Sequence, residues 1–205
     1  MNDEELLAEY SRRHARILVP LATSLTSLLE QRVDSIKRID RVSARAKNPA
    51  RFLIKATKEK EGKRKYADPL SEIQDQVAAR IIVFYLSDVE VVEATIKKYF
   101  NRIEASTVIP DSPKQFGYEG RHLVLAIPEE LFEDEEHSEA PDFFELQIKT
   151  LFQHAWGEAE HDLSYKPSTA LTDLQVREVA FTAAQAWGQT KCLPNSPKNL
   201  RGYSY

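Results

Sequence analysis

The sequence predicts an α+β fold in which a mixed β-sheet of about five strands is flanked by helices. Apolar residues recur at helical spacing over residues 4–33 and again over residues 150–187, near the two ends of the chain. Between them, short β-branched and aromatic runs alternate with helical patterns. The most apolar run, residues 77–86, is too short and too apolar for anything but a central strand.

Each expected element follows from a local pattern. Pro49 and Asp88 mark helix starts, because proline fits the first helical turn and an aspartate side chain accepts hydrogen bonds from free N–H groups there. The acidic stretch 128–142 is expected to be an exposed loop. The expected helices are residues 4–16, 18–33, 49–60, 88–100, 150–165 and 171–187, and the expected strands are residues 36–47, 77–86, 101–109, 121–127 and 142–149.

The composition is that of an ordinary globular protein, with 42% apolar and 29% charged residues in 205. The ten-residue apolar run is far below the ~20 residues that cross a bilayer. A single cysteine, Cys192, cannot form an internal disulfide, and the first residues lack the basic start and apolar stretch of a secretory signal. We therefore expect a cytoplasmic protein without a membrane partner.

Charge is unevenly divided along the chain. Residues 1–66 hold 16 Lys/Arg against 9 Asp/Glu, whereas residues 67–205 hold 12 against 23. The bases concentrate between Arg32 and Lys65, a density suited to nucleotide phosphates or nucleic acid, although a solvated helix face is the alternative. Carboxylates of the acidic half would suit a divalent cation, and a basic wall facing a metal-binding wall is typical of proteins that handle nucleoside triphosphates.

The common catalytic and nucleotide-binding signatures are missing from the sequence. It has neither G-x-x-x-x-G-K-[ST] nor G-x-G-x-x-G, so any nucleotide must be held by side chains. G-x-S-x-G, H-E-x-x-H and paired cysteines are also absent. His154, Glu158, His161 and Tyr165 share one helical face and form a candidate metal site, with hydrogen bonding to a neighbouring element as the alternative.

Polar residues interrupt two of the expected strands. Alternation places Glu145, Gln147 and Lys149 on one face of their strand, which indicates either a site or an edge strand with one wet face. Asp75 precedes the apolar strand and Arg80 lies within it. Burying a cation there is costly unless it is paired or faces a ligand, so Arg80 is a candidate site residue.

Tyr118 lies in a loop between Gly117 and Gly120. Glycines let a flat ligand approach the backbone closely, so this tyrosine is a candidate for stacking on a ligand. The alternative is that Tyr118 only anchors the loop by packing.

The run ELQIKTLFQHAWGEAEHDLSYK, residues 145–166, resembles the RelA/SpoT synthetase domain, whose hallmark is an E-[IL]-Q-I-[RK]-T strand followed by a helix ending E-H-x-x-x-Y-K. Three further motifs occur in family order: RAKNPARFLIK (45–55), DQVAAR (75–80) and KQFGYEGRH (114–122). The resemblance implies a nucleotidyltransferase-like fold. It also implies transfer of a pyrophosphoryl group from ATP to the ribose 3′-hydroxyl of GDP or GTP, which makes the alarmone (p)ppGpp.

The resemblance implies a role for each matching residue on the ATP side. Arg45 and Arg80 would stack on the adenine, as guanidinium planes do well. Lys47 and Lys55 would hold the ATP phosphates, and Arg51, which replaces a family serine, would add a further donor.

The resemblance also implies the metal, the base and the acceptor site. Asp75 and Glu145 would bind Mg²⁺, with Mn²⁺ as a substitute, and Glu145 would take the proton from the 3′-hydroxyl. The acceptor would be bound by Lys114, Tyr118, His122, Gln147 and Lys149.

One departure from the family pattern concerns the acceptor base. Phe116 replaces the asparagine that helps to read guanine, and phenylalanine cannot hydrogen-bond a base edge. Two other functions stay open: a toxic relative that pyrophosphorylates the tRNA 3′ end or makes (p)ppApp, and an inactive nucleotide-sensing module.

Length bears on the domains and partners implied. With 205 residues there is no room for the hydrolase and regulatory domains of long relatives, so we expect a stand-alone small synthetase or the catalytic part of a longer protein. Residues 1–35 would form N-terminal helices, residues 36–190 the synthetase domain and residues 191–205 a tail. Control by an antitoxin and a homo-oligomer, often a tetramer in small relatives, are further expectations.

Overall fold

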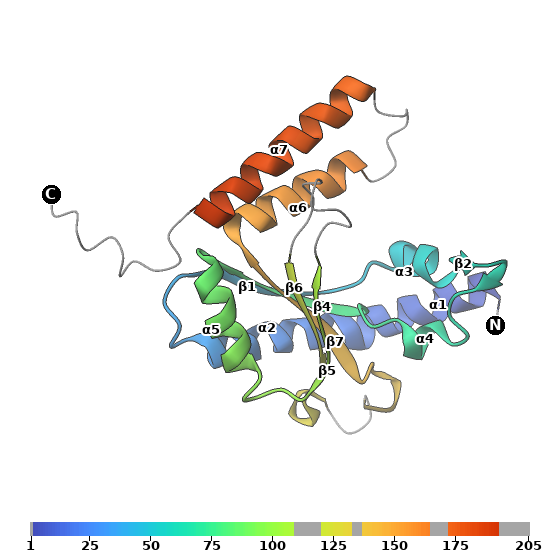
Figure 1. Ribbon diagram of the computed structural model, residues 1–205. Coiled ribbons are helices and arrows are strands. Elements are labelled where there is room, and N and C mark those ends of the chain that lie inside the picture. The colour runs from blue at the N-terminus through green and yellow to red at the C-terminus, as the bar shows by residue number, and fades with distance from the viewer. Residues whose placement is uncertain (1, 109–119, 133–136, 165–171, 193–205) are drawn as a thin grey trace, which may run out of the picture.

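The five-stranded mixed sheet expected from the sequence is confirmed (Figure 1). The computed structural model describes residues 2–108, 120–132, 137–164 and 172–192. The strand order is β1-β4-β7-β6-β5; β4 pairs with β7 in parallel, and the other neighbours are antiparallel. The strands are β1 (Ile39–Ala46), β4 (Val77–Val83), β5 (Arg102–Val108), β6 (Gly120–Ala126) and β7 (Phe143–Thr150).

One face of the sheet forms the hydrophobic core. Alternate residues of β4 and β7 point to this face, and helices α2 (Val19–Val33) and α5 (Leu86–Ile96) cover it (Figure 1). Leu21, Leu25 and Leu29 of α2 belong to the same core, so the N-terminal helices and the sheet are packed together. The fully buried residues that β4 and β7 contribute to this core cluster are Val77, Ala79, Ile81, Val83, Phe144, Leu146 and Ile148.

The N-terminal helical segment is continuous, so of the two arrangements that the patterns over residues 4–16 and 18–33 allow, a packing helix or a helical hairpin, the structure has the first. Helix α1 (Asp3–Arg13) passes through a π-helical turn, η1 (His14–Leu18), into α2. Pro20 lies in the first turn of α2 and lacks the N–H that would bond to the preceding turn. A wider π turn accommodates this missing bond, so the chain does not break there.

Helix α3 (Pro49–Ala56) is shorter than the predicted helix over residues 49–60, and that expectation was wrong at its end. The Asn48 side chain accepts hydrogen bonds from the N–H groups of Ala50 and Arg51 and so starts the helix.

Beyond α3, β2 (Glu59–Lys60) and β3 (Lys63–Arg64) form an unpredicted hairpin whose turn has φ of 55° at Glu61 and 76° at Gly62. Glycine tolerates that conformation, and the turn ends any helix. A short helix, α4 (Pro69–Glu72), follows.

Asp88 is the third residue of α5 and not its N-cap, which is Tyr85, and this corrects the prediction that Asp88 starts the helix. Its buried carboxylate accepts hydrogen bonds from the guanidinium group of Arg38 and, at 3.3 Å, from the N–H of Tyr85. The same side chain therefore forms an ion pair and satisfies an N–H group at the start of the helix. The strand before this helix correspondingly ends at Val83, not at residue 86.

Two helices, of which the first follows β7 directly, rise from the opposite side of the sheet (Figure 1). In α6 (Leu151–Ser164) the first turn is capped reciprocally: the Thr150 N–H donates to the Gln153 side chain at 2.9 Å, and the Gln153 N–H donates to the Thr150 hydroxyl at 3.3 Å. Helix α7 (Asp173–Cys192) packs against α6.

The acidic stretch 128–142 contains two short 3₁₀ turns, η2 (Glu129–Leu131) and η3 (His137–Glu139). Among the described helices, none is both long and apolar enough to span a bilayer.

Tyr10 ties the N-terminal helix to the segment that follows β1. Its ring, fully buried, stacks on Phe52 of α3 with centroids 3.6 Å apart and planes 5° from parallel. Its hydroxyl donates a hydrogen bond of 3.0 Å to the carbonyl oxygen of Lys47. The backbone at Lys47 is also held from the other side, because its N–H donates to the Gln76 carbonyl at 2.8 Å.

We expect Tyr10→Ala to lower the free energy of unfolding by about 3–5 kcal/mol, because it leaves a cavity beside Phe52. Tyr10→Phe removes only the hydroxyl and should cost about 1 kcal/mol. Urea unfolding measures both losses. The control is Tyr99→Ala, since Tyr99 is 53% exposed and its truncation should cost less than about 1 kcal/mol. Equal losses for the two alanine variants would contradict this role of Tyr10.

Candidate active site

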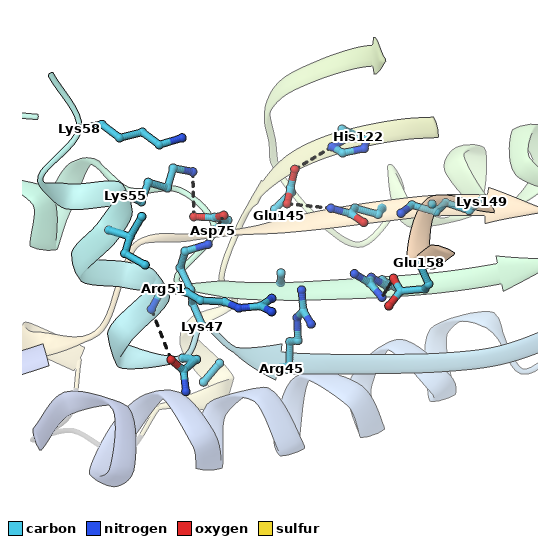
Figure 2. A pocket seen from close by; sticks show the side chains of 17 residues that line it. Arg45, Lys47, Arg51, Lys55, Lys58, Asp75, His122, Glu145, Lys149 and Glu158 are labelled. Carbon is cyan, nitrogen blue, oxygen red and sulfur yellow. Dashed lines mark hydrogen bonds and ion pairs between the residues drawn. The ribbon is translucent and has the colours of Figure 1, made fainter. Parts of the chain in front are cut away.

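The polar face of the sheet carries a pocket of about 780 Å³, a size typical of small-molecule sites (Figure 2). Its walls come from β1, α3, β4, β6, β7 and α6. Three carboxylates line it, from Asp75, Glu145 and Glu158. Seven bases line it as well: Arg45, Lys47, Arg51, Lys55, Lys58, Arg80 and Lys149. The excess of positive charge suits a polyanionic ligand such as a nucleoside triphosphate.

Strand register brings these residues together. Arg45 of β1 is opposite Ala78 of β4, and Ala78 is beside Glu145 of β7. Two residues further along β7, Gln147 has Arg80 of β4 on one side and His122 of β6 on the other. Because side chains alternate along each strand, all of these residues share the face opposite the core.

The edge-strand interpretation of residues 143–150 is wrong. β7 is hydrogen-bonded to β4 on one side and to β6 on the other, so Glu145, Gln147 and Lys149 lie inside the sheet. Their polar character therefore needs the other explanation, that they line a site. The sequence-predicted face is confirmed, since all three line the pocket.

Asp75 forms the centre of a charged cluster at one end of the pocket (Figure 2). Lys47 Nζ donates to its Oδ2 at 2.7 Å, and Lys55 Nζ donates to its Oδ1 at 3.0 Å. Burial alone raises the pKa of Asp75, but the two ammonium groups outweigh burial and hold that pKa below its usual value. Asp75 is therefore ionised at neutral pH.

Glu145 lies next to this cluster and is bonded on both of its oxygens. Oε1 is 2.7 Å from Nδ1 of His122, and Oε2 accepts a hydrogen bond of 3.0 Å from Nε2 of Gln147. Burial raises the pKa of Glu145, but the bonds from His122 and Gln147 outweigh burial and lower it. The buried Oε1 of Gln147 has no hydrogen-bond partner among the described residues, so a ligand donor would fit there.

Two arginines form the other end of the pocket. Arg80 Nη1 donates to Glu158 Oε1 of α6 at 2.6 Å, so of the two conditions that the sequence left open for this cation, pairing or facing a ligand, pairing is met. Burial, together with the charge of Arg80, lowers the pKa of Arg45. Glu158 is the functional partner that sequence reasoning missed: it appeared only as part of a candidate metal stripe, and 78 residues separate it from Arg80.

Lys149 is the most deeply buried base of the pocket, with 4% of its surface exposed. Burial, reinforced by the nearby charge of Arg80, lowers its pKa to about 8. An ammonium held at this depth gains strongly from an anionic ligand.

The remaining predicted site residues divide into three groups. Arg51 lines the pocket from α3, and so does Lys58, which the sequence placed only in the general basic stretch. Lys114 and Tyr118 lie outside the described residues. The predicted histidine stripe is likewise only partly described, through His154 and Glu158, whose Nδ1 and Oε1 atoms are 3.9 Å apart. The side chains of His161 and Tyr165 lie outside the described residues.

The donor set fits a divalent cation of the magnesium type only together with a ligand. Within the described residues, no group of three or more His, Cys, Asp or Glu could hold a metal ion by itself. Asp75 and Glu145 are two ionised carboxylates on one pocket, and Mg²⁺ typically takes one or two carboxylates and completes its six ligands with water and substrate phosphates.

Comparisons with known proteins show the family of the chain. Residues 44–170 match the family described as "Region found in RelA / SpoT proteins". The chain is 30% identical over 170 residues to GTP pyrophosphokinase YjbM of Bacillus subtilis (strain 168), which covers 80% of this chain and 74% of that protein.

Solved structures share the fold. The crystal structure of small alarmone synthetase 1 from Bacillus subtilis covers 98% of each chain with a TM-score of 0.70 and 19% identity. The same enzyme bound to its product pppGpp gives a TM-score of 0.66 and 22% identity over 97% of this chain and 96% of that chain.

We expect the stability of the protein to record the titration of Lys149. A lysine in the unfolded chain has a pKa of about 10.4, whereas the pKa of Lys149 in the folded protein is about 8. Between these values the unfolded state binds more protons, so stability rises with pH. Below pH 8 the full cost of burying the ammonium is present. The gain between about pH 7 and pH 10.5 should be roughly 3 kcal/mol.

Urea unfolding of the wild type and of Lys149→Met across this range measures that gain. The variant lacks the titrating group, so the wild type should become more stable relative to it as pH rises. Parallel pH profiles for the two proteins would show that Lys149 keeps an ordinary pKa.

Proposed function

Because the chain belongs to the RelA/SpoT family of synthetases, we propose that it is an ATP-dependent pyrophosphokinase that acts on GDP or GTP. It transfers the β,γ-pyrophosphoryl group of ATP to the ribose 3′-hydroxyl of the acceptor, releases AMP and makes (p)ppGpp. The observation that carries the proposal is the pocket on the polar face of the sheet, where two ionised carboxylates, Asp75 and Glu145, lie among seven bases. The 30% identity to a GTP pyrophosphokinase supports it.

ATP would lie along the pocket from the lysine end to the arginine end. Lys47 and Lys55 provide ammonium groups for its phosphates, and Arg51 adds a guanidinium from the exposed side of α3. Arg45 and Arg80 provide the flat cations that stack on the adenine. The bond between Arg80 and Glu158 fixes the orientation of one of these planes.

Glu145 is the base in this mechanism. The acceptor 3′-oxygen attacks the β-phosphorus of ATP and forms a new P–O bond, while the bond from the β-phosphorus to the α,β-bridging oxygen breaks. The electron pair of the broken bond leaves with AMP, and the proton of the 3′-hydroxyl passes to the Glu145 carboxylate. His122 and Gln147 hold this carboxylate in place by their bonds to its two oxygens.

Asp75 and Glu145 would hold a magnesium ion, with manganese as a substitute. When bound, the metal supplies positive charge that stabilises the phosphoryl oxygens during transfer. Positioning is then the main task of the protein, because transfer of this kind depends on alignment of the attacking and leaving oxygens.

The acceptor would lie on the β6 side of Glu145. His122 lines the pocket from β6 and Lys149 lines it from β7, and the unpartnered Oε1 of Gln147 offers an acceptor for a ligand donor. Lys114 would add charge for the acceptor phosphates, and Tyr118 would stack on the acceptor base.

A second class of acceptor, the tRNA 3′ end, is favoured by one observation. The exposed residues Lys58, Lys60, Lys63 and Lys65 follow α3 and extend the basic wall beyond the pocket. A long polyanion gains from several such phosphate contacts, whereas a mononucleotide does not. Adenosine nucleotides are the third choice of acceptor, because Phe116 replaces the guanine-reading asparagine.

The acceptor is identified by incubating the purified protein with Mg²⁺ and ATP labelled in its γ-phosphate. GDP, GTP, ADP, ATP and bulk tRNA are offered separately, and the labelled products are resolved. Label on GDP or GTP, together with AMP release, is the expected result. Label on tRNA or adenosine nucleotides alone would favour the alternative acceptors, and no label on any acceptor would favour a nucleotide-sensing module.

We expect Glu145→Gln to lower the rate of transfer by about 100- to 10,000-fold, the usual contribution of a general base. Binding of α,β-methylene-ATP, which lacks the oxygen bridge that breaks, should be retained because both arginines and both lysines remain. Turnover and titration of the analogue measure the two effects. Glu130→Gln, a change at a surface carboxylate of η2, is the matched control. Full turnover of Glu145→Gln would refute this mechanism.

A further inference from the structure

Both oxygens of each carboxylate proposed to hold the metal have a protein group as a hydrogen-bond or ion-pair partner. Asp75 has Lys47 on Oδ2 at 2.7 Å and Lys55 on Oδ1 at 3.0 Å. Glu145 has His122 on Oε1 and Gln147 on Oε2, at 2.7 and 3.0 Å. Each of the four oxygens that would ligate a cation therefore has a protein partner, and at Asp75 the partners are themselves positive charges (Figure 2).

The backbones that carry these lysines are fixed, but their side chains retain freedom. Lys47 is held through both its N–H and its carbonyl group, and Lys55 belongs to α3. Their side chains are 19% and 31% exposed, and each ammonium sits at the end of a flexible four-carbon stem. Each ammonium can therefore exchange Asp75 for another anion without any change in the fold.

A divalent cation that approaches without a nucleotide can bind Asp75 only by replacing the two lysine ammonium groups, and this replacement is unfavourable. It must displace two ammonium groups from Asp75, and the displaced groups remain in a pocket that already has more bases than carboxylates. A nucleotide that approaches with the cation changes this balance, since its phosphates give Lys47 and Lys55 new anionic partners. Two binding events that favour the same rearrangement are coupled, and the coupling is reciprocal.

We propose that Lys47 and Lys55 are internal counter-ions of Asp75, which block the metal site until nucleotide phosphates draw them away. The proposal rests on the proposed function for the identity of the ligands. The lysines are thus positioning residues with two partners in turn: Asp75 in the free protein and phosphate in the complex. The divalent cation and the nucleotide then bind as one unit, and the cation alone binds weakly.

The first test measures Mn²⁺ binding to the full chain without nucleotide, from the loss of the free-ion paramagnetic resonance signal. Lys47→Met and Lys55→Met keep an apolar stem but remove the charge. We expect each to tighten Mn²⁺ binding by about tenfold, within the usual range of coupling. Lys58→Met removes a charge from the same pocket, but Lys58 has no ion pair with Asp75, so it should change the affinity by less than about threefold.

If the lysines instead held Asp75 in the pose that binds metal, their removal would weaken Mn²⁺ binding. Unchanged or weaker binding in both methionine variants therefore overturns the proposal. Adding Asp75→Asn to each variant should abolish the gain, which assigns the gain to that carboxylate. Circular dichroism and urea unfolding confirm that the variants compared are folded.

The second test measures binding of α,β-methylene-ATP in excess EDTA, where no metal takes part. Asp75→Asn frees both lysines for the phosphates and should tighten binding by about tenfold. Glu145→Gln removes a charge from the same pocket but breaks neither ion pair of Asp75 with Lys47 and Lys55, so it should tighten binding by less than about threefold. Equal effects of the two changes would overturn the proposal that the lysines exchange Asp75 for phosphate, because a general effect of pocket charge on nucleotide affinity would then explain both.

The two tests also separate this proposal from the proposed function. If α,β-methylene-ATP binds to no variant, with or without Mg²⁺, ATP is not the ligand and the proposed function fails. The Mn²⁺ comparison still decides whether Lys47 and Lys55 block the metal site.

Discussion

The parallel pairing of β4 with β7 is the constraint on which the rest of the structure depends. These two strands lie inside the sheet and present one face to the core that is apolar except for Thr150 at the end of β7. Strict alternation then forces the intervening residues, among them Arg80 and Glu145, onto the other face. A shift of one residue in register would place charges in the core and apolar side chains in the pocket, so the hydrophobic effect fixes the site as firmly as it fixes the fold.

The charges of the pocket are partly neutralised by one another. Asp75 balances two lysines, Glu158 balances Arg80, and Glu145 is held by His122 and Gln147. The same pairs define two ends of the pocket with different chemistry, since compact ammonium groups gather at one end and planar guanidinium groups at the other. This division matches the phosphates and the base of a nucleotide.

Much of the fold could be predicted from the sequence, and so could most of the site. The five main strands and the long helices follow from local periodicity, and Glu145, Gln147 and Lys149 follow from alternation along a single strand. The misses came where local patterns carry no signal. The β2–β3 hairpin depends on a two-residue turn, and the choice between one continuous N-terminal helix and a helical hairpin depends on a single π-helical turn before Pro20. The ion pair of Arg80 with Glu158 joins residues 78 positions apart.

The sequence by itself determined which residues have chemistry to offer, because charge, size and alternation are local properties of the chain. Only the tertiary structure decided which of them meet. It placed β7 inside the sheet and not at its edge, and it paired Lys47 and Lys55 with one carboxylate. These contacts arise from strand order and helix packing between distant segments, and the free energy that selects them comes from burying the whole core.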